Sequence, residues 1–325
     1  MAVVLNFFVL VCLAVSLGLW IEILRRWRAG ESCIPAEPRA PVPWGPLEIV
    51  LAVGIYFLAA QAIVARGGPQ PDPPAAPAQQ QPPEILAVAQ DAVDDDEAPV
   101  EKPTDREEKL PPRANAAATG IEFLARQILF QLVTVLGCLA FLIVGTRADR
   151  FDLGLPLRHV GRDARLGVVA FVAAAPPTFL LQTLLVQWYP SQHPIVDTLG
   201  KNPGPALLAV ATILAVIVAP WCEEFFFRVL LQGWLEGADA RLRGAPPVAD
   251  DPPTAPPVWP LFASSAVFAA LHAGHGPDPI PLFFLALVLG YLYRQTHRLW
   301  PSFVMHACFN ATSMIAFALS LGEGS

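Results

Sequence analysis

The stretch that sets the fold is GPALLAVATILAVIVAPWCEEFFFR, residues 204–228 of the chain. Its first nineteen residues carry no charge, and two adjacent carboxylates, Glu223 and Glu224, follow directly. The hydrocarbon core of a bilayer is about 30 Å thick, and a helix needs about 20 apolar residues to cross it. The stretch therefore predicts a membrane-spanning helix that continues to about residue 235 and carries ionisable groups in lipid.

The composition of the whole chain points the same way. Hydrophobic residues make up 54% of the 325 residues, charged residues only 15%, and the mean hydropathy is +0.48. Soluble domains carry about 25% charged residues, so this chain cannot coat a globule with water-facing groups. A soluble enzyme and a wholly disordered chain are excluded, and without a basic patch a nucleic acid is excluded as partner.

Eight apolar runs are long enough, or nearly so, to cross a bilayer. They are residues 3–24, 45–65, 119–145, 165–188, 204–222 with its continuation, 258–273, 280–296 and 300–321. We predict an all-α fold, a polytopic transmembrane bundle of about eight helices, with the first run an uncleaved anchor. The sixth and seventh runs are short and contain Gly and Pro, so we expect them inside the bundle or beside water.

Residues 67–118 interrupt this pattern. They hold eleven acidic and four basic residues, an excess that equals the net charge of −7 of the whole chain, and they are rich in proline. Such a composition cannot bury enough apolar surface to order itself, so we predict a disordered, acidic extramembrane linker. The chain then divides into an N-terminal pair of transmembrane helices (1–66), the linker (67–118) and a transmembrane core (119–325).

The positions of the arginines predict the orientation of the chain in the membrane. Arginines follow the first run (Arg25, Arg26, Arg28, Arg39), the third (Arg147, Arg150, Arg158, Arg162, Arg165), the fifth (Arg241, Arg243) and the seventh (Arg294, Arg298). If eight spans alternate, all four connections lie on one side, and the positive-inside rule makes that side cytoplasmic. Both termini are then outside.

Ionisable groups inside lipid are costly and indicate function. Glu223 and Glu224 point about 100° apart on a helix, so they cannot share one task. Glu224 and Arg228 are four residues apart and can form an internal ion pair, the reading we favour for them. Glu223 is left without an obvious partner and suits a general base, the alternative being a carboxylate that reaches the cytoplasmic interface.

Two further polar positions lie in apolar runs. His272 and His275 are three residues apart and could bind a metal, although spacing alone favours a hydrogen-bonded core histidine for either. His306 and Asn310 share one helix face and suit an oxyanion hole or a ligand with its positioning neighbour. The alternative for this pair is a hydrogen-bonded contact between helices.

The order of these motifs resembles the CPBP family of intramembrane proteases, also called the Abi family, which includes the type II CAAX prenyl endopeptidases. The resemblance rests on Glu223-Glu224-x-x-x-Arg228, Phe268-x-x-x-His272 and His306-x-x-x-Asn310. Supporting patterns are Gly290-x-x-Tyr293, Thr296, Leu299-Trp300-Pro301-Ser302 and Phe151-Asp152-Leu153-Gly154-Leu155. It covers about residues 150–320.

The resemblance implies a role for each residue. Glu223 would activate the attacking water, His272 would hold that water or a metal ion, and His306 with Asn310 would stabilise the oxyanion. Glu224 and Arg228 would support them. The family has been described both as zinc metalloproteases and as metal-free, glutamate-activated proteases, so Zn²⁺ held by Glu223, His272 and His306 is one of two routes.

We therefore predict an intramembrane endopeptidase, of CAAX type and a metalloendopeptidase if zinc is present, that cleaves a membrane-associated peptide or protein from a cavity open to the cytoplasm. A non-catalytic immunity or scaffold protein of the same fold and a proton-coupled transporter are the alternatives. The Ala-, Pro- and Arg-rich composition with three lysines (Lys102, Lys109, Lys201) is typical of a GC-rich bacterium. There the inner membrane is the expected location, and a prenylated substrate is not expected.

Overall fold

The computed structural model describes residues 2–38, 41–64, 113–188, 199, 204–244, 257–273 and 278–323. Within these ranges every regular element is a helix. The α-helices are α1 (Ala2–Arg28), α2 (Pro46–Val64), α3 (Arg113–Phe141), α4 (Val160–Val186), α6 (Pro205–Ile213), α7 (Ala219–Glu224), α8 (Gly233–Leu242), α9 (Trp259–Ala270), α10 (Pro279–Thr296) and α11 (Leu299–Glu323). Three π-helical segments continue them: η1 (Leu142–Thr146), η2 (Leu214–Val218) and η3 (Phe225–Gln232). The prediction of an all-α helical bundle is confirmed.

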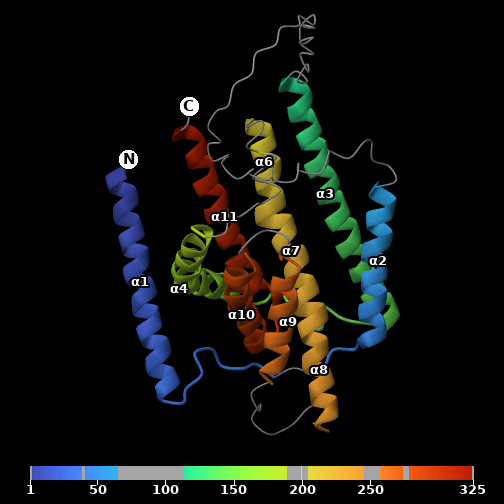
Figure 1. Ribbon diagram of the computed structural model, residues 1–325. Coiled ribbons are helices and arrows are strands. Elements are labelled where there is room, and N and C mark those ends of the chain that lie inside the picture. The colour runs from blue at the N-terminus through green and yellow to red at the C-terminus, as the bar shows by residue number, and fades with distance from the viewer. Residues whose placement is uncertain are drawn as a thin grey trace, which may run out of the picture.

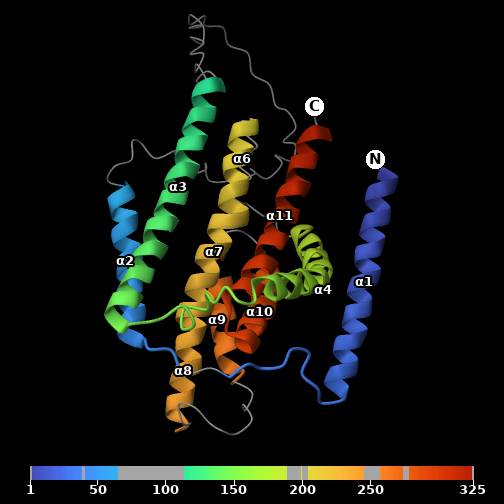
Figure 2. The same ribbon diagram turned by 180° about the vertical axis from the view of Figure 1, so that it is seen from behind.

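The long helices run up and down, and α4 lies obliquely among them (Figure 1). The rod from α6 to α8 stands in the middle, with α3 and α2 on one side and α11, α4 and α1 on the other (Figure 2). Both chain ends lie at one end of the bundle, as alternating spans require. The lower ends of α1 and α8, where arginines follow or close the helix, lie at the opposite end.

The protein is an integral, multi-pass membrane protein. Five stretches of the described residues are long and apolar enough to cross a bilayer: Pro46–Ile63, Thr119–Thr146, Val160–Val186, Pro205–Leu242 and Leu299–Leu321. The rod Pro205–Leu242 has 38 residues, which at 1.5 Å per residue is about 57 Å and exceeds the bilayer core. The rod therefore extends beyond residue 235, the predicted end of this helix.

Two predictions about length need adjustment. The helix of the first run, α1, is not among the candidate spans. The sixth and seventh runs form α9 and α10, and neither of these is among them. These helices pack on each other and on the rod, so protein rather than lipid surrounds their ends. The predicted linker mostly lies outside the described residues, but its last six residues, 113–118, belong to α3, which begins at Arg113.

Pro177 in α4 leaves a backbone carbonyl free to bind side chains of α1. Pro177 lies four residues after Ala173 in α4 and has no N–H, so the Ala173 carbonyl lacks its usual helical donor. Two side chains of α1 supply donors instead: Ser16 Oγ at 3.1 Å and Trp20 Nε1 at 2.9 Å. A carbonyl left unpaired in lipid would cost several kcal/mol, roughly, so this contact fixes α1 against α4.

The start of α11 is fixed by a turn from the family-like pattern at residues 151–155. Asp149 Oδ1 accepts the N–H groups of Phe151 and Asp152 and closes the turn. Gly154 follows with φ of +68°, a backbone conformation that favours glycine. Its carbonyl accepts the N–H of Leu299 at 2.8 Å, which satisfies an otherwise unpaired donor in the first turn of α11.

Candidate active site

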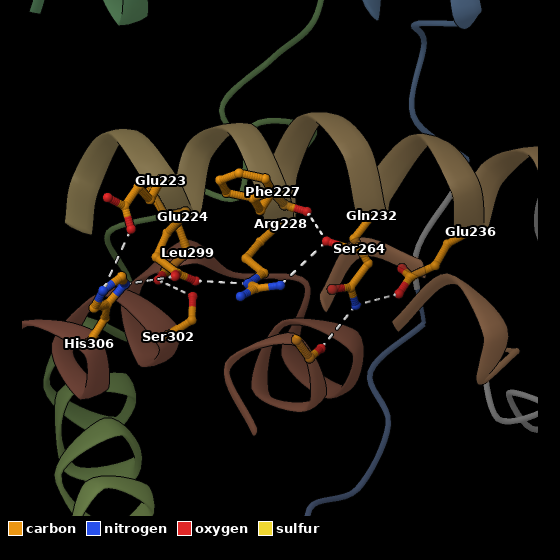
Figure 3. A network of polar contacts seen from close by, with 11 residues as sticks. Glu223, Glu224, Phe227, Arg228, Gln232, Glu236, Ser264, Leu299, Ser302 and His306 are labelled. Carbon is orange, nitrogen blue, oxygen red and sulfur yellow. Dashed lines mark hydrogen bonds and ion pairs between the residues drawn. The ribbon is translucent and has the colours of Figure 1, made fainter. Parts of the chain in front are cut away.

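The two adjacent carboxylates lie where the central rod changes its helical register. Glu223 and Glu224 end α7, a six-residue α-helix between the π-helical segments η2 and η3. π-helical turns are rare and often occur at functional sites, since they re-aim side chains relative to an α-helix. Figure 3 shows both glutamates and Arg228 on this rod, with His306 facing them from α11.

Glu224 and Arg228 form the ion pair predicted from their spacing. Arg228 Nε donates to Glu224 Oε2 at 3.1 Å, and both side chains are fully buried. Arg228 Nη1 also donates to Ser264 Oγ of α9 at 3.3 Å, and that hydroxyl donates to the Phe227 carbonyl at 2.7 Å. The pair thus connects the rod to α9 and places a negative charge beside α11.

His306 lies between the two glutamates. Its Nδ1 is 3.0 Å from Glu224 Oε1, and its Nε2 is 3.7 Å from Glu223 Oε2. An ionised carboxylate can only accept, so Nδ1 carries the proton and Nε2 faces Glu223. His306 is buried, whereas the Glu223 side chain is 30% exposed. Of the two carboxylates, Glu223 is therefore the one with an accessible side.

The Phe268 ring places the motif Phe268-x-x-x-His272 near His306. Its centroid is 4.7 Å from the His272 ring and 6.1 Å from the His306 ring, and Arg228 Cζ lies 5.5 Å from it. His272 Nδ1 is 2.8 Å from the Phe268 carbonyl, which only accepts, so Nδ1 is the protonated nitrogen. The neutral ring then has its acceptor at Nε2, as holding a water would require.

Asn310 lies one helical turn after His306 and contacts the rod. Its Nδ2 donates to the Ala215 carbonyl of η2 at 2.8 Å. In η2 the Ala219 N–H bonds five residues back to Leu214, so the next donor in this register would be residue 220. That residue is Pro220 and has no N–H, so Asn310 satisfies a carbonyl that the helix leaves unpaired. The helix–helix contact considered for Asn310 is present.

The polar network continues beyond the predicted residues. Gln232 Nε2 donates to Glu236 Oε1 and to the Gly290 carbonyl, both at 2.9 Å. Gln232 and Ser264 are fully buried. Neither residue was predicted as part of the site. Ser264 is a polar residue within an apolar run, and that pattern could have indicated it. Figure 3 shows two groups of contacts along the rod, one from His306 to Ser264 and a separate one from Gln232 to Glu236.

Comparison with known proteins gives one match. Residues 205–312 match the family model of the type II CAAX prenyl endopeptidase Rce1-like proteins. This region is similar to that family, and we refer to residues 205–312 by that similarity as the Rce1-like domain. No curated protein matches the chain, and no solved structure matches it either.

The Rce1-like domain contains all six predicted site residues, Glu223, Glu224, Arg228, His272, His306 and Asn310. It spans 108 of the 325 residues, about a third of the chain. The pattern at residues 151–155, which we also assigned to the family, lies before the matched region and acts on it through Leu299. The family model that it matches is one of endopeptidases.

His306 lies in a cluster with three other ionisable side chains, Glu223, Glu224 and Arg228. Glu223 and Glu224 carry two negative charges against the one positive charge of Arg228 when all are ionised. A second proton on His306 would neutralise the cluster and would leave Nε2–H as a donor toward Glu223. The arrangement therefore offers a reachable carboxylate and a hydrogen-bond donor within one small volume, the two functions that peptide hydrolysis needs.

Glu223, His272 and His306 are the side chains predicted to hold zinc. A catalytic zinc ion takes three protein ligands and one open position. Among the side chains that the structure describes, no group of three or more His, Cys, Asp and Glu residues is placed to hold a metal ion. Glu223 and His306 form a pair, so the three-residue zinc site with His272 remains a prediction.

Proposed function

We propose that this protein is an intramembrane endopeptidase in which Glu223 activates a water molecule. The observation that carries the proposal is the 3.7 Å approach of the partly exposed Glu223 carboxylate to Nε2 of the buried His306. Glu224 orients His306 from its other ring nitrogen, and Arg228 holds Glu224. If Glu224 and Arg228 formed only an internal ion pair, the second, accessible carboxylate of Glu223 would not be needed.

The chemistry follows from these positions. Glu223 takes a proton from water, whose oxygen attacks the carbonyl carbon of the scissile peptide bond. The oxyanion accepts a hydrogen bond from protonated His306 Nε2, with Glu224 holding the Nδ1–H. Glu223 then delivers its proton to the leaving nitrogen, the C–N bond breaks, and a carboxylic acid and an amine result. General acid–base steps of this kind contribute about 10²–10⁴-fold to a rate.

His272 and Asn310 complete the proposal. We assign His272 to the water that Glu223 activates, since its ring lies against Phe268 with Nε2 as the acceptor. Asn310 remains a proposed oxyanion donor through its second amide hydrogen, while the contact with Ala215 fixes its side chain. The substrate is a membrane-associated peptide or protein, and the site opens toward the cytoplasm of a bacterial cell.

The test is cleavage of a membrane-embedded peptide by the purified protein in detergent or vesicles. Glu223→Gln should lower kcat by about 10²-fold or more, because glutamine cannot take the proton of water. Glu122→Gln is the matched control, since the Glu122 side chain on α3 is 63% exposed and pairs with Arg126. Unchanged cleavage by Glu223→Gln would contradict the proposal, and pH-gradient-driven uptake without peptide cleavage would favour a transporter.

Removal of metal ions distinguishes the zinc route from the metal-free route. With Glu223 acting as base and His306 as donor, chelator-treated protein containing less than one metal ion per ten chains should keep its cleavage rate. Elemental analysis measures the metal content of the same sample whose activity is assayed. A loss of activity that added Zn²⁺ restores, together with one bound zinc per chain that His272→Ala abolishes, would establish the zinc route instead.

A further inference from the structure

The segment between α1 and α2 crosses one end of the Rce1-like domain. We call its described residues, 31–38 and 41–44, the connecting segment. Figure 1 and Figure 2 show it as the blue trace that runs past the lower ends of α10 and α9 and across α8. It lies more than 150 residues before the matched region, which begins at residue 205. Its contacts nevertheless fall on the helices that carry the site.

A cluster of ion pairs joins the connecting segment to the start of α11, with Asp163 and Arg298 buried and the Glu37 side chain 38% exposed. Arg298 is the residue immediately before α11, and its side chain is only 5% exposed. Its Nε donates to Asp163 Oδ2 of α4 at 2.7 Å, and its Nη1 donates to Glu37 Oε2 of the connecting segment. Burial opposes charge on Arg298, but the two carboxylates outweigh it and raise its pKa, so the guanidinium stays charged.

Further contacts hold Glu37 in place. The Glu37 N–H donates to the Gln295 carbonyl at the end of α10 at 2.8 Å, and Gln295 Nε2 donates back to Ser32 Oγ at 3.1 Å. Arg162 Nη2 donates to the other Glu37 carboxylate oxygen at 2.7 Å. Although partly exposed, Glu37 therefore makes directed contacts with α4, with α10 and with Arg298, the residue before α11.

The rest of the connecting segment fixes the central rod. Trp44 is fully buried, and its Nε1 donates at 3.2 Å to the carbonyl of Leu230, two residues after Arg228. Arg241 Nη2 of α8 donates to the Val42 carbonyl at 2.7 Å. One short segment thus holds both the rod that carries Glu223 and the helix that carries His306.

We propose that Glu37 is a positioning residue for the peptidase reaction, which holds the start of α11 through Arg298 so that His306 stays opposite Glu223. This inference rests on the proposed function. His306 follows Arg298 by eight residues, which is about 12 Å along a helix, so a shift or tilt at the base of α11 reaches the ring. A misplacement of about 1 Å at a reacting group can cost about 10²-fold in rate.

The experiment compares three variants of the full chain in the peptide-cleavage assay. Glu37→Gln should lower kcat at least about tenfold with KM within about twofold of the parent, since the substrate-binding surface is untouched. Glu37→Asp keeps the charge and should restore most of kcat. Glu31→Gln is the matched control, the same substitution on an exposed glutamate of the same segment, and should match the parent.

A second measurement separates positioning from loss of folded protein. Hydrogen exchange of the backbone amides of residues 299–306 should be faster in Glu37→Gln than in Glu31→Gln, while exchange in α3 stays the same. Parent-like kcat in Glu37→Gln, no recovery in Glu37→Asp, or faster exchange throughout the molecule would each overturn the proposal. If the parent chain cleaves no peptide, the proposed function fails, and parent-like exchange at residues 299–306 would still overturn the role of Glu37 by itself.

Discussion

Glu224 shows why two adjacent glutamates have different environments. Its carboxylate is fully buried and lies between Arg228 on its own helix and His306 on α11, whereas Glu223 keeps an exposed side. The i, i+4 spacing was enough to predict the contact with Arg228, because helix geometry fixes it. The contact with His306, 82 residues away, depends on how α11 packs, and no local pattern encodes that distance.

Removal of the Glu224 charge tests this arrangement. Glu224→Gln should lower the free energy of unfolding by about 3–5 kcal/mol, because it leaves Arg228 charged and buried without a counter-ion. Thermal or denaturant unfolding in a single detergent measures the loss. The double variant Glu224→Leu with Arg228→Met removes both charges, and should recover most of the stability while staying inactive because His306 loses its partner. Recovered activity in the double variant would show that Glu224 has no part in catalysis.

At the scale of helices, prolines determine where side chains bridge neighbours. Pro177 frees the Ala173 carbonyl for Ser16 and Trp20, and Pro220 frees the Ala215 carbonyl for Asn310. In both cases the freed acceptor lies inside a span, where water cannot satisfy it. A proline within a predicted span therefore marks a helix–helix contact, and here one such contact adjoins the carboxylate pair of the site.

The link between Asn310 and Pro220 predicts non-additive stabilities. Asn310→Ala should cost about 1–3 kcal/mol in the free energy of unfolding, because the Ala215 carbonyl is left unpaired. In a Pro220→Ala background, residue 220 supplies an N–H, and the same substitution should cost less than about 1 kcal/mol. Unfolding of the four proteins of this double-mutant cycle gives the coupling energy. Equal costs in the two backgrounds would show that the proline is not what requires Asn310.

The crossing of α4 and α11 gives a second prediction at this scale. A Cβ on Gly167 would lie 2.6 Å from the Pro301 carbonyl oxygen and 3.1 Å from the Met305 backbone nitrogen, one residue before His306. Gly167→Ala should therefore destabilise the protein by about 1–3 kcal/mol and lower cleavage.

Gly161, in the same helix, is the control for Gly167. It has nothing within 4 Å of a Cβ, and Gly161→Ala should stabilise the protein by about 0.5–1 kcal/mol. Unfolding curves of the two alanine variants under the same conditions compare them directly. A Gly167→Ala protein as stable as Gly161→Ala would mean that α11 can move away from α4 without cost.

At the scale of the whole molecule, length and apolarity predicted the helices well. All eight predicted runs are helical, because a bilayer admits helices of about this length and little else. The sixth and seventh runs were predicted as short helices inside the bundle, and α9, with 12 residues, is too short to be a candidate span. Nothing in the sequence indicated that residues 31–44 reach the end of the bundle, because Glu37, Val42 and Trp44 find their partners only through tertiary packing.

The two ends of the central rod test the orientation of the molecule. Gly204 precedes α6 in extended backbone with open space around it, and Arg243 follows α8 with an exposed side chain. The positive-inside rule places the Arg243 end in the cytoplasm and the Gly204 end outside. In a chain whose five native cysteines are replaced, a membrane-impermeant thiol reagent should label Gly204→Cys in intact cells and Arg243→Cys only after permeabilisation. Retained membrane insertion of both variants is the control. The reverse labelling would place the connecting segment and its charge cluster outside the cell, and a peptidase opening toward the cytoplasm could not be maintained.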